Sequence, residues 1–313
     1  MKDIDRLLDP ATAGFHRSWF PVALARAVTV EKPLGIDLLG TRVVAYRDPS
    51  GSAVVQTAWC PHLGADLSRG EVIEGQIRCP YHHWQFDRSG ACSHIPTGDK
   101  IPQGARIFTF PSAEAWGLIW AFNAAEPLFP VPTIPGITER DLTIEARQRS
   151  TRPLPPWVAT SNGIDFQHLR TLHGLSTSTP DTISVSDYAI EYRIETDRYL
   201  QHGRITGTNV FAQHIRREGL DTYMLFGGSP IDGGSSRGFC VVGVQKGGDE
   251  AADRHLAAAR LEGVSRFVEQ LLAEDDPVLN TMRFKVGVLT SSDRHLARYF
   301  KYVADFPTGE VPA

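Results

Sequence analysis

The sequence predicts an α+β protein, in which an all-β module is followed by a domain that packs a sheet with helices on one side. Three observations support this prediction. Residues 19–122 read mostly as short strands, a proline-rich segment follows at residues 126–137, and strand-like runs at residues 183–244 precede a long helical stretch. The length of 313 residues also suggests two domains, at a prior of about 150 residues per domain.

The strands of the N-terminal module are expected where β-branched and aromatic residues concentrate, at residues 42–48, 53–59 and 116–122. Turn sequences separate these runs, such as Asp-Pro-Ser-Gly at residues 48–51 and Arg-Ser-Gly at residues 88–90. The pattern is that of an all-β module.

The proline-rich segment is the best domain boundary, because it holds four prolines between residues 126 and 137. We therefore expect a first domain at residues 1–130 and a second at residues 131–313. In the second domain, residues 161–173 read as a helix entered by Ser and Asn cap residues. A longer helix is expected from about residue 251 to beyond residue 275.

The composition is that of an ordinary globular protein, with 42% hydrophobic and 22% charged residues. The formal net charge of −4 gives no electrostatic reason to expect nucleic acid as a partner. The first ten residues, MKDIDRLLDP, do not look like a secretory signal, and no apolar run approaches the length of a membrane span. Without a signal, four cysteines favour metal binding or catalysis over disulfides, and we expect a cytoplasmic protein.

The strongest motif in the sequence is Cys60-Pro-His62, followed after sixteen intervening residues by Cys79-Pro-Tyr-His82. A zinc site also uses two Cys and two His, but zinc motifs usually pair Cys with Cys and His with His along the chain. Here each loop gives one thiolate and one imidazole. That arrangement is typical of a Rieske [2Fe–2S] cluster, in which two thiolates hold one iron and two histidines hold the other.

The loops CPHLGADL and CPYHHWQFD resemble the two cluster loops of Rieske non-haem iron oxygenases. The chain departs from that family at His83, where the usual residue is Gly, and this change affects the surface that the cluster presents to electron partners. Respiratory Rieske proteins place an extra disulfide at the positions of Ala65 and Tyr81 and a serine at the position of Trp84. Fewer hydrogen bonds to the cluster sulfurs should lower the potential of the cluster, as suits a donor to an oxygen-activating iron.

A second motif, Asp165-x-x-His168-x4-His173-Gly174, matches the family pattern for a mononuclear iron. Two histidines and a distant carboxylate form the facial triad of non-haem iron(II) oxygenases. Asp165 and His168 are three residues apart and would share a helix face. Gly174 fits a helix end, at which the backbone can turn His173 back toward the metal.

Three acidic residues, Glu274, Asp275 and Asp276, compete for the third ligand position. The apolar residues Leu261, Val264, Val268, Leu271 and Leu272 form a one-faced helical stripe, and Asp275 continues it. A carboxylate in a buried stripe needs a partner, which a metal would supply. Asp275 also sits two residues before Pro277-Val278, as the family's ligand does, so we expect Asp275 first and Asp276 next. Glu274 reads as part of a solvated helix end.

The resemblance covers nearly the whole chain and implies a Rieske domain followed by a helix-grip catalytic domain. It also implies a ring of three chains in which Asp165 bridges a cluster histidine and an iron histidine. We expect the residues of the substrate site to include Asn162, Phe166, Phe211, Met224 and Phe226.

The resemblance further implies a terminal oxygenase that uses dioxygen and two electrons to hydroxylate a hydrophobic organic molecule, as in the ketosteroid hydroxylase and sterol desaturase branch. The electrons would come from a separate NAD(P)H-dependent reductase, directly or through a ferredoxin, because no nucleotide-binding Gly-x-Gly-x-x-Gly motif follows a strand. Demethylation, N-oxygenation, desaturation and cis-dihydroxylation are alternatives at the same iron. A Rieske electron-transfer protein is the alternative from another class, and a metal-binding regulator is a more remote one.

Overall fold

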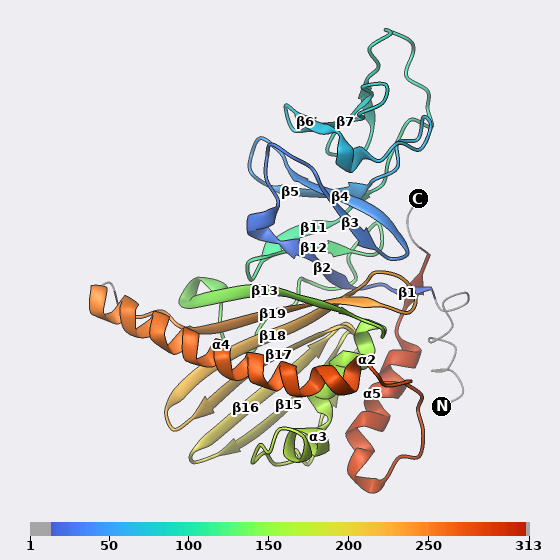
Figure 1. The fold of residues 1–313 in the computed structure, drawn as a ribbon. Helices are drawn as coiled ribbons and strands as arrows, with labels where there is room; N and C mark the ends of the chain where they lie inside the picture. Colours follow the sequence, from blue (N-terminus) through green and yellow to red (C-terminus); the bar gives the residue numbers. More distant parts are fainter. Residues whose placement is uncertain (1–13, 249, 311–313) are drawn as a thin grey trace.

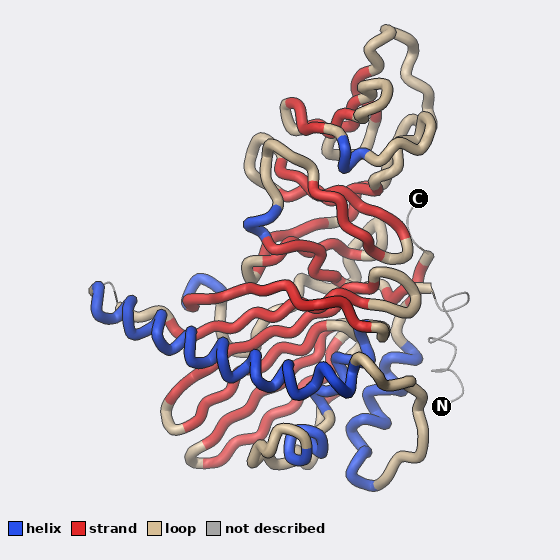
Figure 2. Tube along the Cα trace, viewed as in Figure 1, coloured by secondary structure: helices blue, strands red, loops and turns tan. Residues whose placement is uncertain are grey.

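The computed structural model describes residues 14–248 and 250–310, so the N-terminal sequence read above for a secretory signal lies outside the described residues. An all-β module stacks on the large sheet of a second, α+β domain, which confirms the predicted fold class (Figures 1 and 2). Within the described part of the chain, no helix is both long enough and apolar enough to cross a membrane. The boundary between residues 130 and 131 stays a prediction.

The β module contains three small sheets, with strand orders β10-β5-β4-β3, β11-β12-β2 and β6-β7-β8-β9. Its strands are β2 (Trp19–Leu24), β3 (Leu34–Leu38), β4 (Thr41–Arg47), β5 (Ala53–Thr57), β6 (Glu71–Ile73), β7 (Gln76–Arg78), β8 (Gln85–Phe86), β9 (Cys92–His94), β10 (Thr109–Phe110), β11 (Ser112–Ala115) and β12 (Leu118–Phe122). Short 3-10 helices lie at Ala25–Ala27 and Leu67–Arg69. The three strand runs expected from the sequence therefore correspond to β4, β5 and β12.

Strand β12 joins the two domains, because its alternating side chains enter two different hydrophobic cores. Leu118, Trp120 and Phe122 pack in the core shared with the second domain. Ile119 and Ala121 pack in the core of the β module. All five side chains are buried, so the sequence LIWAF is apolar throughout rather than alternating with polar residues.

The second domain is built on an antiparallel sheet of seven strands, in the order β13-β19-β18-β17-β16-β15-β14. Helix α4 (Ala251–Leu279) runs across one face of this sheet (Figure 1), where Val268 packs with Met224, Cys240 and Val242. The strands are β13 (Leu142–Arg152), β14 (Ser184–Val185), β15 (Ala189–Thr196), β16 (Tyr199–Thr206), β17 (Val210–Arg217), β18 (Leu220–Pro230) and β19 (Ser236–Gln245). The long helix expected after residue 251 is thus confirmed.

The single helix expected at residues 161–173 is wrong, because two short pieces divide this stretch, the 3-10 helix η4 (Ser161–Ile164) and helix α3 (Phe166–Thr171). The short helix α2 (Pro156–Thr160) precedes them. The break lies at Asp165, which leaves helical backbone geometry with φ −89° and ψ 85° and caps α3 by accepting from the amides of Gln167 and His168. A capping aspartate starts a new helix rather than continuing the old one.

The remaining elements are helix α5, three short 3-10 or strand segments near the C-terminus and before β13, and the strand at the start of the described chain. Helix α5 (Arg294–Asp305) follows the 3-10 helix at Ser291–Asp293, and a further 3-10 helix at Glu139–Asp141 precedes β13. The buried Tyr299 of α5 donates its hydroxyl hydrogen to the carbonyl of Trp157 at 2.7 Å, or to that of Thr208 at 2.9 Å. The short strands β1 (Phe15–His16) and β20 (Thr308–Gly309) pair with each other.

Candidate metal centres

The two cysteine loops of the β module have the same backbone hydrogen-bond pattern. In the first loop, the amide of Cys60 donates to the carbonyl of Ala65 at 2.9 Å, and the amide of Gly64 donates to the carbonyl of Cys60 at 2.8 Å. In the second loop, the amide of Cys79 donates to the carbonyl five residues on at 2.8 Å, and the amide four residues on donates to the carbonyl of Cys79 at 3.1 Å. The loops are therefore two copies of one tight turn, each presenting a cysteine at its start.

The four residues predicted to hold the cluster lie together, with the thiols inside and the imidazoles outside. Cys60 and Cys79 are 3% and 1% exposed, and neither forms a disulfide. His62 and His82 are exposed, with ring centroids 4.6 Å apart. Burial raises the pKa of the Cys60 thiol to about 12, and the amides of His62 and Leu63 lie within hydrogen-bonding reach of its sulfur. Buried sulfurs beside backbone N–H donors fit an iron–sulfur cluster.

The histidine that replaces the family's glycine has a structural explanation. His83 adopts a left-handed backbone with φ +57°, and Gly64 at the equivalent position of the first loop has φ +76°. The turn requires this conformation, which glycine adopts freely, and His is among the residues enriched there. The loop geometry is thus kept, and the change places an exposed imidazole beside His82.

The second motif brings its two histidines together with the carboxylate of α4. One possible ligand atom from each of His168, His173 and Asp275 falls within 4.8 Å of the others. Asp275 Oδ1 lies 3.3 Å from His173 Nε2 and 3.9 Å from His168 Nε2. His173 follows α3, and the left-handed Gly174 (φ +63°) comes directly after it. Two imidazoles and one carboxylate that face a common point fit the facial-triad arrangement.

The other nitrogen of each histidine ring is occupied by a hydrogen bond. His168 Nδ1 donates to the backbone carbonyl of Asp165 at 2.6 Å, and His173 Nδ1 donates to Glu274 Oε2 at 2.7 Å. Because both Nδ1 atoms carry the proton, both Nε2 lone pairs are free to bind a metal. A fixed tautomer is what a metal site of this type requires.

Two sequence predictions about the hydrogen-bond partners of the histidines are wrong. The carboxylate of Asp165 was expected to accept from His168, but its Oδ1 caps α3 and the backbone carbonyl accepts instead. Glu274 was read as a solvated helix end, but it supports His173. That contact joins residues 101 positions apart, so helix periodicity alone could not reveal it.

The neighbouring carboxylates of α4 have different partners. Asp275 is 8% exposed, and burial raises the pKa of its carboxyl, while His168 and His173 act in the opposite direction. The side chain of Asn162, which lines the same cavity, also acts to lower this pKa. Asp276 instead accepts from Arg152 at 2.6 Å. A metal would offset the cost of burying the Asp275 carboxylate, whereas Asp276 already has its counter-ion.

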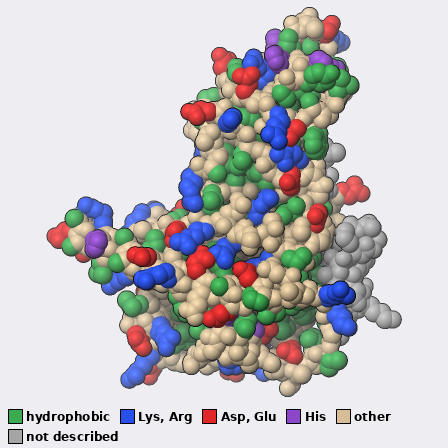
Figure 3. Space-filling model, in the orientation of Figure 1, with side chains coloured by type: hydrophobic (Ala, Val, Ile, Leu, Met, Phe, Trp, Pro, Cys, Tyr) green, Lys and Arg blue, Asp and Glu red, His purple; other side chains and the backbone are tan. Residues whose placement is uncertain are grey.

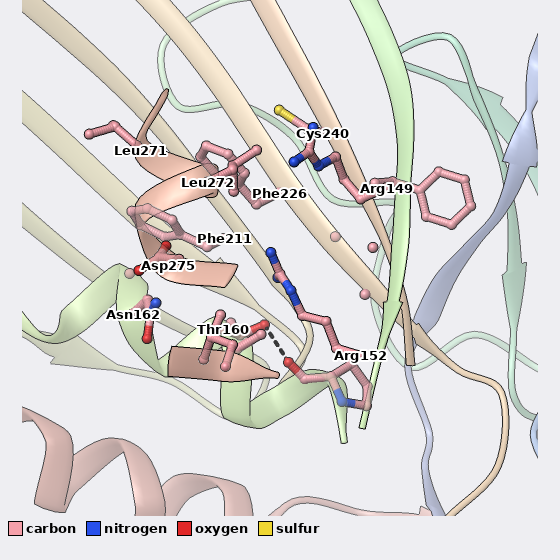
Figure 4. Close-up of a pocket in the computed structure, with 18 of the residues that line it drawn as sticks. Arg149, Arg152, Thr160, Asn162, Phe211, Phe226, Cys240, Leu271, Leu272 and Asp275 are labelled. Atoms are coloured by element: carbon pink, nitrogen blue, oxygen red, sulfur yellow. Dashed lines mark hydrogen bonds between the residues drawn. The ribbon is translucent and has the colours of Figure 1, made fainter. Parts of the chain in front are cut away.

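A cavity of about 130 Å³ opens beside these side chains, and Asn162, Phe211 and Phe226 line it (Figure 4), while their role in a substrate site stays a prediction. Met224 lines an adjoining cavity of about 310 Å³, which shares Asn162 and Phe211 with the first. The prediction for Phe166 is wrong. This side chain is buried against Tyr192, at a centroid distance of 5.0 Å, and lines neither cavity.

The cavity residues that the sequence prediction missed include two cations, Arg149 and Arg152 of β13. Their strand carries charged residues at many positions, and those that face solvent look no different in the sequence from those that face the cavity. The only available signal was the alternation of side chains between the two faces of a strand at residues 142–152. The register shift between Gln148 and Thr151 disrupts this alternation.

Comparison with known proteins identifies the N-terminal module. Residues 18–111 match the family model described as the Rieske [2Fe-2S] domain. The chain is 39% identical over 132 residues to aminopyrrolnitrin oxygenase PrnD of Pseudomonas fluorescens, a match covering 40% of this chain and 36% of that protein. It is 34% identical over 127 residues to the oxygenase component of 3-ketosteroid-9-alpha-monooxygenase of Rhodococcus rhodochrous, covering 40% and 33%. The chain thus spans less than half the length of these curated relatives.

Solved structures extend the likeness to almost the whole chain. The Pseudomonas putida CBB5 NdmA structure with caffeine superposes with a TM-score of 0.76 at 19% identity, covering 97% of this chain and 92% of that one. Dicamba monooxygenase bound to dicamba superposes with a TM-score of 0.73 at 20% identity, covering 93% and 97%. The chain therefore carries a Rieske [2Fe–2S] domain at residues 18–111, and its overall fold is that of the NdmA and dicamba monooxygenase structures.

Proposed function

We propose that the chain is the oxygenase component of a Rieske non-haem iron system and hydroxylates a small hydrophobic organic molecule. One observation carries this proposal: His168, His173 and Asp275 converge at the wall of a mainly apolar cavity in a chain that also has a Rieske domain. A Rieske protein that only transferred electrons would need neither a second ligand set nor a cavity beside it. When bound, the two iron centres would supply stored electrons and the activation of dioxygen.

Each surrounding residue then has a definite task. The carbonyl of Asp165 and the carboxylate of Glu274 hold the two imidazoles with their Nε2 atoms facing the metal position. Asn162 lines the same cavity as Asp275 and favours the charged form of its carboxyl, so its amide would help to hold that carboxylate. The apolar side chains of the cavity exclude water and position the substrate; they include Phe211, Phe226, Leu271 and Leu272.

We further propose that electrons cross between chains, in a ring of three. The cluster loops and α3 lie at opposite ends of the molecule (Figure 1), which disfavours transfer within one chain. Hydrophobic and histidine side chains gather at the tip that carries the cluster (Figure 3), where Trp59, Leu63 and Tyr81 are 47%, 67% and 64% exposed. Such a tip suits docking on a neighbouring chain, and head-to-tail contacts close when the rotation closes.

The ring would bring His82 of one chain near Asp165 of the next. Asp165 Oδ1 is used in capping α3, so we assign the second carboxylate oxygen to the contact with His82, while the backbone carbonyl of Asp165 holds His168. The electrons would come from a separate NAD(P)H-dependent reductase, directly or through a ferredoxin. We place the protein in the cytoplasm, whose reducing conditions suit the free thiols of its four cysteines.

Hydroxylation is one of several reactions that this ligand set can support. Demethylation, N-oxygenation, desaturation and cis-dihydroxylation are the alternatives, and the names of the relatives include a monooxygenase, a dioxygenase and a desaturase. The product formed from one identified substrate would distinguish them.

The proposal is tested by reducing the purified protein without oxygen, adding air, and measuring dioxygen uptake and products from a panel of small hydrophobic compounds. His168→Ala should keep the visible spectrum of the cluster and lose product formation, because the sites lie in different domains. If His168→Ala forms as much product as the unaltered protein, the catalytic role of this site is refuted and electron transfer becomes the better reading.

A further inference from the structure

The cavity wall that β13 contributes carries two cations. Arg149 and Arg152 both line the cavity, and their side chains are only 19% and 11% exposed. Among the labelled side chains of Figure 4, Arg152 extends from the strand toward the helix that carries Asp275, and Arg149 lies beside Cys240. A guanidinium facing an apolar cavity is costly unless it is paired, so its presence needs a reason.

The ion pairs of these arginines leave hydrogen-bond donors unused. Arg152 Nη2 donates to Asp276 Oδ1 at 2.6 Å, and Arg149 Nη1 donates to Glu269. Each guanidinium has five N–H donors. Within the described residues, the Nε atoms of both arginines have no hydrogen-bond partner. The pairs with α4 therefore fix the guanidinium positions without satisfying their donors.

The charges that face the cavity are mostly positive. The carboxylates that pair with the arginines, Glu269 and Asp276, do not line the cavity, and Asp275 is the sole carboxylate among the described lining residues. Asp275 is the proposed metal ligand, so its charge would be taken up by the metal. An anionic group entering the cavity would meet Arg152 and a bound cation, with no free carboxylate to repel it.

The size of the cavity limits the body of the ligand. Its volume of about 130 Å³ is close to that of an engineered protein cavity of roughly 150 Å³ that accepts benzene. Phe211, Phe226 and Leu271 contribute apolar wall, and the adjoining cavity of about 310 Å³ leaves room for a substituent. One ring with a short polar group fits these dimensions.

Resting on the proposed function, we infer that the substrate is a small ring-bearing carboxylate whose anionic oxygens are bound by Arg152, with Arg149 beside it. The carboxylate accepts from the guanidinium nitrogens not engaged with Asp276, and the ring lies against the phenylalanines. This assignment gives the two arginines a role in substrate choice, in addition to tying β13 to α4.

The test compares acids with their neutral amides. Iron-loaded protein is titrated by calorimetry without oxygen, using benzoate, phenylacetate and cyclohexanecarboxylate, each against its own amide. At least one acid should bind at least about tenfold more tightly than its amide. Arg152→Gln should weaken binding of that acid by roughly tenfold to a hundredfold, the range for a charge-assisted hydrogen bond, and leave the amide unchanged.

Arg147 supplies the matched control. It pairs with Glu145 and Glu269 in the same ion-pair network but does not line the cavity, so Arg147→Gln should leave acid binding unchanged. If circular dichroism shows that Arg152→Gln does not fold, Arg152→Lys is measured in its place. The inference is supported if this variant still prefers the acid to its amide but binds the acid more weakly. It is overturned if the affinity for the acid is unchanged.

Three results would overturn the inference: no acid binding at millimolar concentration, equal binding of acid and amide, or an equal loss in Arg147→Gln. The proposed function fails on different grounds, namely absence of the iron centres or of dioxygen uptake. If the protein holds both iron centres and oxidises only neutral compounds, the proposed oxygenase function is supported and the inference that the substrate is a carboxylate is refuted.

Discussion

Replacing Glu274 with Gln keeps the shape of the side chain beside the proposed metal site but removes its negative charge and one of its two acceptor oxygens. Glu274 Oε2 accepts from His173 Nδ1 at 2.7 Å, and this hydrogen bond holds the pKa of the Glu274 carboxyl below its usual value. The amide of Gln keeps the shape but is a weaker acceptor, so His173 becomes a poorer and less firmly oriented ligand. Removing such a support typically costs tenfold to a hundredfold in metal affinity.

The position of Glu274 indicates which end of that range applies. Its side chain is 32% exposed, whereas that of His173 is 2% exposed. Solvent screens an exposed carboxylate, so we expect Glu274→Gln to weaken iron binding by about tenfold, and Glu274→Ala by more. The cluster, in the other domain, should be unaffected.

The assay is competition for iron(II) between the protein and a chelator of known affinity, with the visible spectrum of the cluster followed in parallel. Gln270→Ala is the control, because Gln270 donates to Glu274 Oε1 at 2.9 Å and does not reach His173. The reasoning is refuted if Glu274→Gln holds iron as tightly as the unaltered protein, or if Gln270→Ala weakens iron binding equally.

Three further predictions concern other parts of the molecule. Asp275→Ala should lose the mononuclear iron and keep the cluster in elemental analysis, and the choice of ligand is wrong if Asp276→Ala does this instead. Burial lowers the pKa of His16 from 6.5 to about 4. Between pH 6.5 and about pH 4, His16 therefore binds a proton in the unfolded chain but not in the folded chain. The free energy of unfolding should therefore fall as pH drops from 6.5 toward 4, by at most about 1.4 kcal/mol per unit; urea unfolding at several pH values should show this slope, and an equal slope in His16→Asn would contradict it. Mixed rings of Cys60→Ala and His168→Ala chains, each inactive alone, should regain part of the activity by pairing a sound cluster with a sound iron site, and mixed rings that stay inactive would argue against transfer between chains.

The two cysteine loops of the Rieske domain could be predicted because their signal is local. Cys60 and Cys79 each open a short loop with a histidine at fixed spacing, and the tight turn needs only those few residues. Asp275 was singled out by another local signal, the apolar stripe of α4, and the structure places its side chain with His168 and His173. The fold class followed from strand and helix periodicity in the same way.

The residues that were missed depend on contacts between distant segments. Glu274 meets His173 only because α3 and α4 come together, and Arg152 faces the cavity only because β13 pairs with β19 in one register. Phe166 was placed in the pocket because it neighbours the histidine motif. The helix restarts at Asp165, and that restart turns Phe166 toward Tyr192 instead.

The iron and sulfide content of protein purified without oxygen tests the account most directly. One Rieske cluster and one facial-triad site predict about three irons and about two inorganic sulfides per chain. About one zinc per chain with no sulfide would contradict the account at its centre.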